Sequence, residues 1–280
     1  MNTFVALGGG DEVGASCYYL KLGEANIMLD CGSRNGIKKY PYFDTLIENK
    51  ILRSTDDIDI IAISHAHKDH YAALPTVANL KDSRIISTPE TKSEIIRMID
   101  VLYKKNYFES EEEKFSFKHL VSTIFEFDYF EIIKCKDVEI MLVPAGHIPG
   151  AAITVMFYDG MKIVYTGDFS LPLSDNQIYN ELAIEMMMDC DLLIMENTNG
   201  DDFMSKKMMS KHSNFDQMME FLGIVHPKKL FLIHQNTDSF YQYGFKEKIN
   251  KYYPSIQTTK IKNKVIYDLG VLVWIKILKL

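Results

Sequence analysis

Three histidines and one aspartate lie within the six residues from His65 to His70. Imidazole nitrogens and carboxylate oxygens are ligands that zinc, iron and manganese take in proteins. In an extended segment, side chains two residues apart point to the same side, so His65 and His67 can face one point in space. Asp69 and His70 follow at a bend, where they would face a second point nearby. The spacing therefore predicts two metal ions side by side.

This cluster must be held by the elements on either side of it. Residues 58–63 form an apolar run rich in β-branched side chains, which predicts a buried strand. Residues 71–80 are expected to begin a helix. The cluster would then lie at the carboxyl end of a strand, which is where ligands and reactive groups collect in α/β sheets.

Other apolar runs end in a single polar side chain of the same chemical types. The side chains at or just after these ends are Asp30, His147, Asp168 and His234. If all the strand ends meet, they supply two metal-binding groups. The first group would consist of His65, His67 and His147. The second would consist of Asp69, His70 and His234.

Two carboxylates complete this predicted site. Asp168 would bridge the two metal ions. Asp30 would accept the second N–H of a ligand histidine and so orient its ring. Zinc is the expected metal, and manganese or iron would also suit these ligands.

The remaining chain reads as alternating strands and helices with no repeat, low-complexity segment or linker, so we expect a single domain over residues 1–280. The other predicted strands are 4–7, 16–21, 26–30, 84–88, 125–133, 137–143, 153–158, 162–165, 191–195, 229–233 and a closing set within 258–280. The other predicted helices are 91–106, 214–225 and 240–252. Residues 33–49 are expected to be irregular.

A glycine-rich segment, residues 8–14, follows the first predicted strand. It lacks the GK[ST] ending of a phosphate-binding P-loop. A turn that needs positive φ angles is the favoured interpretation, and a loop passing close to substrate phosphate is the alternative.

Composition limits the function further. The formal charge is −7 and the pI about 5.6, so net charge alone would not attract nucleic acid. Nucleic-acid binding would need a local basic rim, for which the candidates are Lys38, Lys39, Lys68, Lys206, Lys207 and Lys211. The four cysteines form no CxxC pair, and Cys17 and Cys31 are expected to be buried thiols. With no signal peptide and no apolar segment of membrane-spanning length, we expect a cytoplasmic protein without a membrane partner.

The order of these residues resembles the metallo-β-lactamase fold superfamily. The sequence around each motif is similar to the β-CASP ribonucleases, which include the endonuclease that processes messenger-RNA 3′ ends. The segments that carry this likeness are 27–32, 64–75, 145–151 and 165–170. The resemblance implies an α/β fold, an αββα sandwich of two mixed β-sheets flanked by helices. Residues 210–213 resemble a family segment whose histidine assists the leaving group, which implies His212 as a general acid.

The family's cap domain has no counterpart in this sequence. In β-CASP ribonucleases it is inserted between the segments that resemble residues 191–196 and 210–234, and only a short polar stretch lies there in this chain. Because the cap forms one wall of the RNA cleft, its absence leaves the substrate open. The sequence also leaves open whether a homo-oligomer replaces this wall.

These observations predict a hydrolase with two metal ions, in which a bridging hydroxide is the nucleophile and Asp69 and Asp168 orient it. The first hypothesis is a phosphodiesterase, a nuclease acting on RNA or single-stranded DNA. The alternative is a small-molecule hydrolase of the same fold, acting on a lactone, a thioester or a cyclic nucleotide. A third hypothesis is a non-catalytic scaffold, which the complete ligand set opposes.

Overall fold

The apolar run before His65 forms strand β4, Ile60–Ala62, which is shorter than the predicted strand and buried at all three residues. It pairs in parallel with β3, Ala25–Leu29, on one side and with β5, Arg84–Ser87, on the other. β4 is therefore an inner strand of a sheet. The structure is a computed structural model, and it describes residues 2–34, 41–77, 84–104, 108, 110–200, 211–235 and 244–270.

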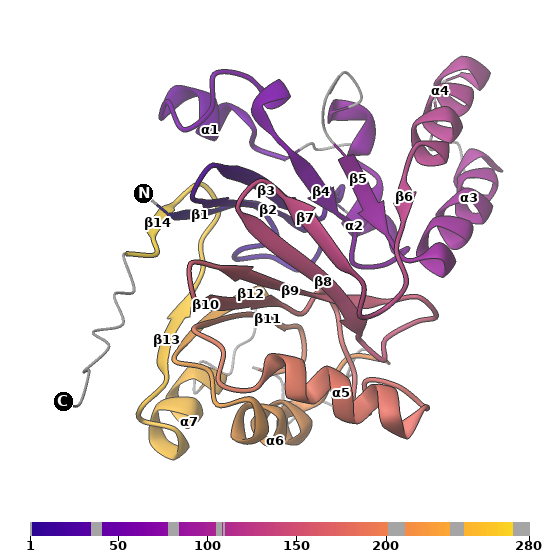
Figure 1. Ribbon diagram of the computed structural model, residues 1–280. Helices are drawn as coiled ribbons and strands as arrows, with labels where there is room; N and C mark the ends of the chain where they lie inside the picture. The colour runs from indigo at the N-terminus through magenta and orange to yellow at the C-terminus, as the bar shows by residue number, and fades with distance from the viewer. Residues whose placement is uncertain are drawn as a thin grey trace.

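Two mixed sheets pack face to face (Figure 1). Within the described ranges, the first has the order β14-β1-β2-β3-β4-β5-β6, and the second has the order β13-β12-β11-β10-β9-β8-β7. The other strands of the first sheet are β1 Thr3–Gly8, β2 Cys17–Leu22, β6 Phe125–Glu126 and β14 Ile266–Asp268. Those of the second are β7 Ile132–Cys135, β8 Val138–Pro144, β9 Ala152–Tyr158, β10 Met161–Tyr165, β11 Leu192–Asn197, β12 Lys229–Gln235 and β13 Gln257–Lys260.

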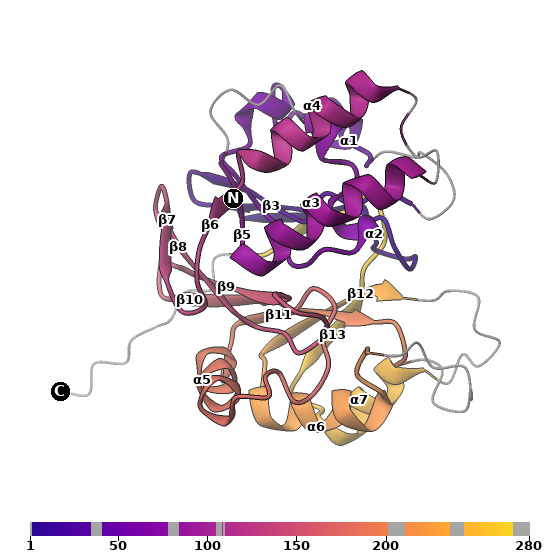
Figure 2. The same cartoon turned by 90° about the vertical axis from the view of Figure 1, so that its right-hand side faces the viewer.

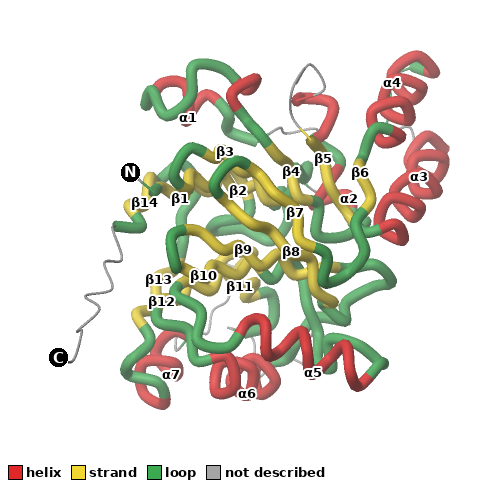
Figure 3. Tube along the Cα trace, viewed as in Figure 1, coloured by secondary structure: helices red, strands yellow, loops and turns green. Residues whose placement is uncertain are grey.

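Helices cover the outer face of each sheet, as Figures 2 and 3 show. Those over the first sheet are α1 Asp44–Glu48, α2 Lys68–Tyr71, α3 Pro89–Lys104 and α4 Glu111–Ser122. Those over the second are α5 Gln177–Met187, α6 Phe215–Val225 and α7 Phe245–Tyr252. This arrangement confirms the predicted αββα sandwich. No helix in the described part of the chain is long and apolar enough to cross a membrane.

The alternation of side chains along the strands creates three apolar layers. On β2, Tyr18 points between the sheets, whereas Tyr19 points toward the helices over the first sheet. Phe4 on β1 and Phe231 on β12 meet between the sheets, with ring centroids 5.4 Å apart. The two sheets are thus held together by direct packing of buried rings.

Several predicted elements have different bounds in the structure. The helix expected over residues 71–80 begins earlier, at Lys68, and ends at Tyr71; a 3₁₀ turn, Leu74–Val77, follows. Pro75 within that turn has no N–H to continue a helix. The strand expected over 125–133 is two strands, β6 and β7. The irregular segment 33–49 contains helix α1, and residues 35–40 lie outside the described ranges.

Two helix starts follow the local sequence closely. Helix α3 begins at Pro89, where a missing N–H costs nothing. Helix α6 begins after Asn214, which forms a capping box with Gln217.

Helix α5, which the sequence pattern did not predict, is capped by Asn176. Helix α7 begins at Phe245, and residues 240–243 of the predicted helix lie outside the described part, as do residues 271–280.

Candidate metal centre

The strand ends that the sequence singled out meet at one edge of the sandwich. His65 and His67 follow β4, and His147 follows β8 of the other sheet. Nε2 of His65 lies 3.0 Å from Nδ1 of His67, and Nε2 of His147 lies 3.2 Å from the same atom. Three imidazoles from two sheets therefore face a common point.

A second group lies beside the first. It consists of Asp69, His70 and His234, and their potential ligand atoms all lie within 4.8 Å of one another. Oδ2 of Asp69 is 3.6 Å from Nε2 of His234. His234 reaches the site from the end of β12 with a left-handed backbone, φ 48°. Asp69 and His70 lie in the first turn of α2, not on a bend before a helix as the sequence predicted.

Asp168, which follows β10, lies between the two groups. Its Oδ2 is 3.6 Å from Nε2 of His65 in the first group and 3.4 Å from Nε2 of His70 in the second. Its Oδ1 is 3.7 Å from Nδ1 of His234 and has no hydrogen-bond partner among the described residues, although it is buried. A buried carboxylate oxygen without a partner is costly unless something else occupies it.

The donor set fits divalent cations. Burial lowers the pKa of His65 well below its usual value, and the neighbouring ring of His70 lowers it further. Burial also lowers the pKa of His147. These two rings are therefore neutral at pH 7 and offer lone pairs, which is the form that binds metal. The unpartnered Oδ1 of Asp168, on the side of His234, is a further oxygen that could bind a cation.

Asp30 is the anchor of the second group. Its Oδ1 accepts the backbone N–H of Ser64 at 2.6 Å. Its Oδ2 accepts the Ser64 hydroxyl at 2.7 Å, Nδ1 of His70 at 2.7 Å and the Tyr165 hydroxyl at 2.5 Å. With Nδ1 occupied in this way, Nε2 of His70 is turned toward Asp168. Asp30 thus contacts His70, and its role in orienting that ring as a metal ligand stays a prediction.

The segment after β3 presses directly against α2. Gly32 lies so close to the carbonyl oxygen of Asp69 that an added Cβ would be 1.6 Å away from it. That carbonyl accepts the N–H of Ser16, and the carbonyl of His70 accepts the N–H of Cys31, both at 2.8 Å. The backbone of the second group is therefore held from two sides.

His212 lies at the rim of the same site. Its Nε2 is 3.7 Å from Oδ2 of Asp168, and its Nδ1 is 2.7 Å from Oε2 of Glu196, a fully buried carboxylate at the end of β11. Burial on its own would lower the pKa of His212, but the charge and hydrogen bond of Glu196 outweigh it and raise the pKa to about 9. His212 is therefore protonated at neutral pH. The role of Glu196 was missed from the sequence, although it ends an apolar strand as the other site residues do.

A hydrogen-bonded chain links His212 to His234. Thr198 donates its hydroxyl hydrogen to Glu196, and Nδ1 of His234 lies 2.8 Å from the Thr198 hydroxyl oxygen. Nε2 of His234 accepts the backbone N–H of Gly14 at 3.0 Å. The glycine-rich segment thus reaches the candidate site while Gly9 and Gly14 adopt the positive φ angles that a turn requires. Metal binding through Nε2 would displace the Gly14 N–H.

The predicted basic rim is described only in part, because Lys38, Lys39, Lys206 and Lys207 lie outside the described ranges. The carbonyl of Lys211 accepts a hydrogen bond from Nδ1 of His147. Lys68 is the first residue of α2. The four cysteines are free and buried, as expected for Cys17 and Cys31.

Comparison with known proteins shows which families and relatives the chain resembles. A family model described as a β-lactamase superfamily domain matches residues 26–235. Endoribonuclease YSH1 of Yarrowia lipolytica is 34% identical over 209 residues, which cover 71% of this chain and 24% of that protein. The probable RNase MJ4 of Methanocaldococcus jannaschii is 30% identical over 222 residues, or 75% of this chain and 49% of that protein. The matched part of this chain thus spans about a quarter of the length of YSH1 and about half of the length of MJ4.

Solved structures of similar fold cover nearly the whole chain. The metallo-β-lactamase fold protein YhfI of Bacillus subtilis has a TM-score of 0.62 at 14% identity, covering 95% of this chain and 98% of that one. Human tRNase Z, short form, has a TM-score of 0.59 at 18% identity, covering 96% of this chain and 100% of that one. The sequence relatives of the chain are ribonucleases of the β-CASP group, and no cap domain is evident in the described residues. The match of the family model to residues 26–235 shows that the chain belongs to the metallo-β-lactamase superfamily.

Proposed function

We propose that the protein is a phosphodiesterase with two metal ions that cleaves RNA. The observation that carries this proposal is the position of Asp168, whose carboxylate lies within 4 Å of nitrogens from both imidazole groups and keeps one buried oxygen without a hydrogen bond. Such a carboxylate between two groups of imidazole nitrogens suits a pair of divalent ions.

The ligands of the first ion would be His65, His67 and His147. The ligands of the second would be Asp69, His70 and His234. Asp168 would be shared between them. Zinc suits this set of imidazoles and carboxylates, and manganese or iron are the alternatives. When bound, such ions acidify water and neutralise charge that develops on a phosphoryl group.

The chain's own residues would then carry the proton transfers. The carboxylates of Asp69 and Asp168 lie inside the site, where they can accept a hydrogen bond from the attacking water and aim it. His212 holds a proton at neutral pH because Glu196 raises its pKa, so it can protonate the leaving oxygen. Asp30 keeps the ring of His70 in one orientation.

RNA is the proposed substrate because YSH1 and MJ4, which match about seven-tenths of this chain, are named as an endoribonuclease and a probable RNase. The same match favours RNA over single-stranded DNA and over a lactone or thioester. The scaffold hypothesis would be favoured by a missing ligand, and all seven predicted ligand residues are present and lie together.

The test uses chelator-treated protein reloaded with zinc or manganese and a labelled single-stranded RNA. We expect about two metal ions per chain by elemental analysis and cleavage that depends on the added metal. His67→Ala and Asp168→Asn should abolish cleavage, whereas His119→Ala, on the exposed face of α4, should not. Absence of metal-dependent cleavage by the wild type, or equal cleavage by His67→Ala, would refute the proposal.

A further inference from the structure

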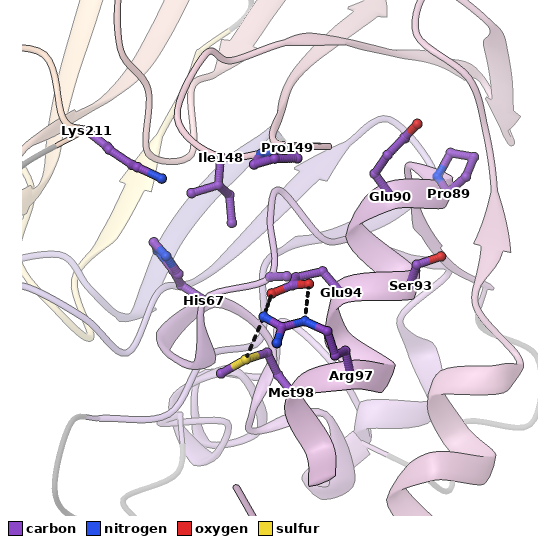
Figure 4. A pocket seen from close by; sticks show the side chains of 11 residues that line it. His67, Pro89, Glu90, Ser93, Glu94, Arg97, Met98, Ile148, Pro149 and Lys211 are labelled. Atoms are coloured by element: carbon purple, nitrogen blue, oxygen red, sulfur yellow. Dashed lines mark hydrogen bonds and ion pairs between the residues drawn. The ribbon is translucent and has the colours of Figure 1, made fainter. Parts of the chain in front are cut away.

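A cavity of about 730 Å³ lies directly beside the candidate metal centre. It is bounded by helix α3 on one side and by residues 148–149, which follow His147, on the other (Figure 4). His67 lines the cavity and also belongs to the first metal-binding group. The cavity therefore begins at the candidate metal centre and leads away from it along α3.

The walls of the cavity combine apolar surface with a polar edge. Met98, Ile148 and Pro149 supply aliphatic surface. Arg97 forms a two-pronged ion pair with Glu94, with Nε to Oε2 at 2.8 Å and Nη2 to Oε1 at 2.5 Å. In Figure 4 this pair lies between Met98 and Ser93, at the side of the cavity formed by α3. This solvent-exposed pair places hydrogen-bond donors and acceptors beside apolar surface.

The charges in the cavity cancel. Two carboxylates, Glu90 and Glu94, are matched by two cations, Arg97 and Lys211. The cavity wall therefore has no net positive charge that would draw a phosphate into the interior. Lys211 lies on the same side as His67, and its backbone is tied to His147. In Figure 4, Lys211 lies at the His67 end of the cavity, whereas Arg97 is paired with Glu94.

We infer that this cavity binds the base of one unpaired nucleotide next to the phosphate that is cleaved. The inference rests on the proposed function and specifies its substrate as single-stranded at that position. A nucleobase has apolar faces for Met98, Ile148 and Pro149 and an edge of donors and acceptors for the Arg97–Glu94 pair. A base inside a duplex is stacked and paired, so it cannot enter. Lys211 would contact the phosphate that joins this nucleotide to the metal centre.

A binding experiment tests the cavity without any catalysis. Adenosine 5′-monophosphate and ribose 5-phosphate differ only in the base, and each is titrated calorimetrically into chelator-treated protein. We expect the nucleotide to bind at least about tenfold more tightly than the sugar phosphate. Ser93→Trp places a large ring in the cavity and should remove this preference. Ile96→Trp, on the same helix but not in the cavity wall, should keep it.

Equal affinity for the two probes in the wild type, or a preference that survives Ser93→Trp, would overturn the inference whether or not the protein is a nuclease. A second measurement joins the cavity to cleavage. Single abasic sites are placed in turn along a single-stranded RNA, and one beside the cleaved bond should raise KM about tenfold for the wild type but not for Ser93→Trp. If no RNA is cleaved at all, the proposed function fails, and the binding experiment alone decides what the cavity takes.

Discussion

Replacing Asp30 with asparagine keeps the shape of the side chain and removes its negative charge and one acceptor oxygen. In the structure, Oδ2 of this buried carboxylate accepts three hydrogen bonds, from the Ser64 hydroxyl, His70 and Tyr165. Its Oδ1 accepts a fourth, from the backbone N–H of Ser64. An asparagine has one oxygen and one NH₂ group. Whichever way the amide is turned, at least one of these donors then faces another donor.

The size of the effect follows from this mismatch. A buried donor left without an acceptor costs about 1–3 kcal/mol, and each hydrogen bond to a charged group contributes about 1.5–3 kcal/mol. One lost bond and the weakening of three others should lower the free energy of unfolding by about 3–5 kcal/mol. Zinc affinity should also fall, by about 10–100-fold, because the ring of His70 is no longer held by an anion.

Asp159→Asn is a matched control. Asp30 and Asp159 both have a left-handed backbone, with φ angles of 59° and 47°. Asparagine tolerates this conformation, so neither substitution adds backbone strain. Asp159 is exposed in the β9–β10 turn, and its substitution should change the free energy of unfolding by less than about 0.5 kcal/mol.

The assay is urea unfolding of the metal-free proteins, followed by zinc titration against a competing chelator. A loss below about 1 kcal/mol for Asp30→Asn, close to the value for Asp159→Asn, would refute the reasoning. If Asp30→Asn fails to fold, Tyr165→Phe provides a smaller perturbation, because it removes one donor and leaves none unpaired. We expect it to cost about 1–2 kcal/mol.

Two further predictions concern the other contacts of the site. Glu196→Gln removes the charge that raises the pKa of His212 to about 9, and burial then lowers that pKa. The falling limb of the cleavage rate against pH should therefore move to lower pH, and an unchanged limb would argue against His212 as the proton donor. Gly32→Ala forces the backbone of Asp69 away. It should lower the free energy of unfolding in urea by about 3 kcal/mol, the upper end for overpacking, and should also weaken zinc binding. A variant with normal stability and normal zinc affinity would contradict the close packing described.

The sequence predicted the strand ends because each combines an apolar run with a change of residue type at its end. That signal is local, and it located Asp30, the cluster at 65–70, His147, Asp168 and His234. Glu196 has the same signal, but its importance comes from its contact with His212, sixteen positions along the chain. Which carboxylate faces which imidazole is a property of the packed sheets, so the spacing of residues alone does not reveal it.

The differences in element bounds have a similar cause. The apolar run 58–63 contains three strand residues, because only Ile60–Ala62 finds parallel partners on both sides. Helix α5 carries Ile178, Tyr179 and Leu182 on an exposed face, which obscures the one-sided apolar pattern that predicts a surface helix. The cavity beside His67 could not be predicted from the sequence either, because its walls come from α3 and from a segment about fifty residues later.

The two sheets contribute unequally to the candidate centre, and this couples the site to the fold. The loop after β4 and the first turn of α2, both in the first sheet's half, supply His65, His67, Asp69 and His70. The second sheet supplies His147, Asp168 and His234. On the proposed assignment each ion has ligands from both sheets. An ion that binds only the folded chain stabilises it by about 2.7 kcal/mol at a free concentration a hundred times its Kd. The ions would therefore join the sheets at this edge, as Phe4 and Phe231 do inside, and the spacing of the ligands depends on how the two sheets pack.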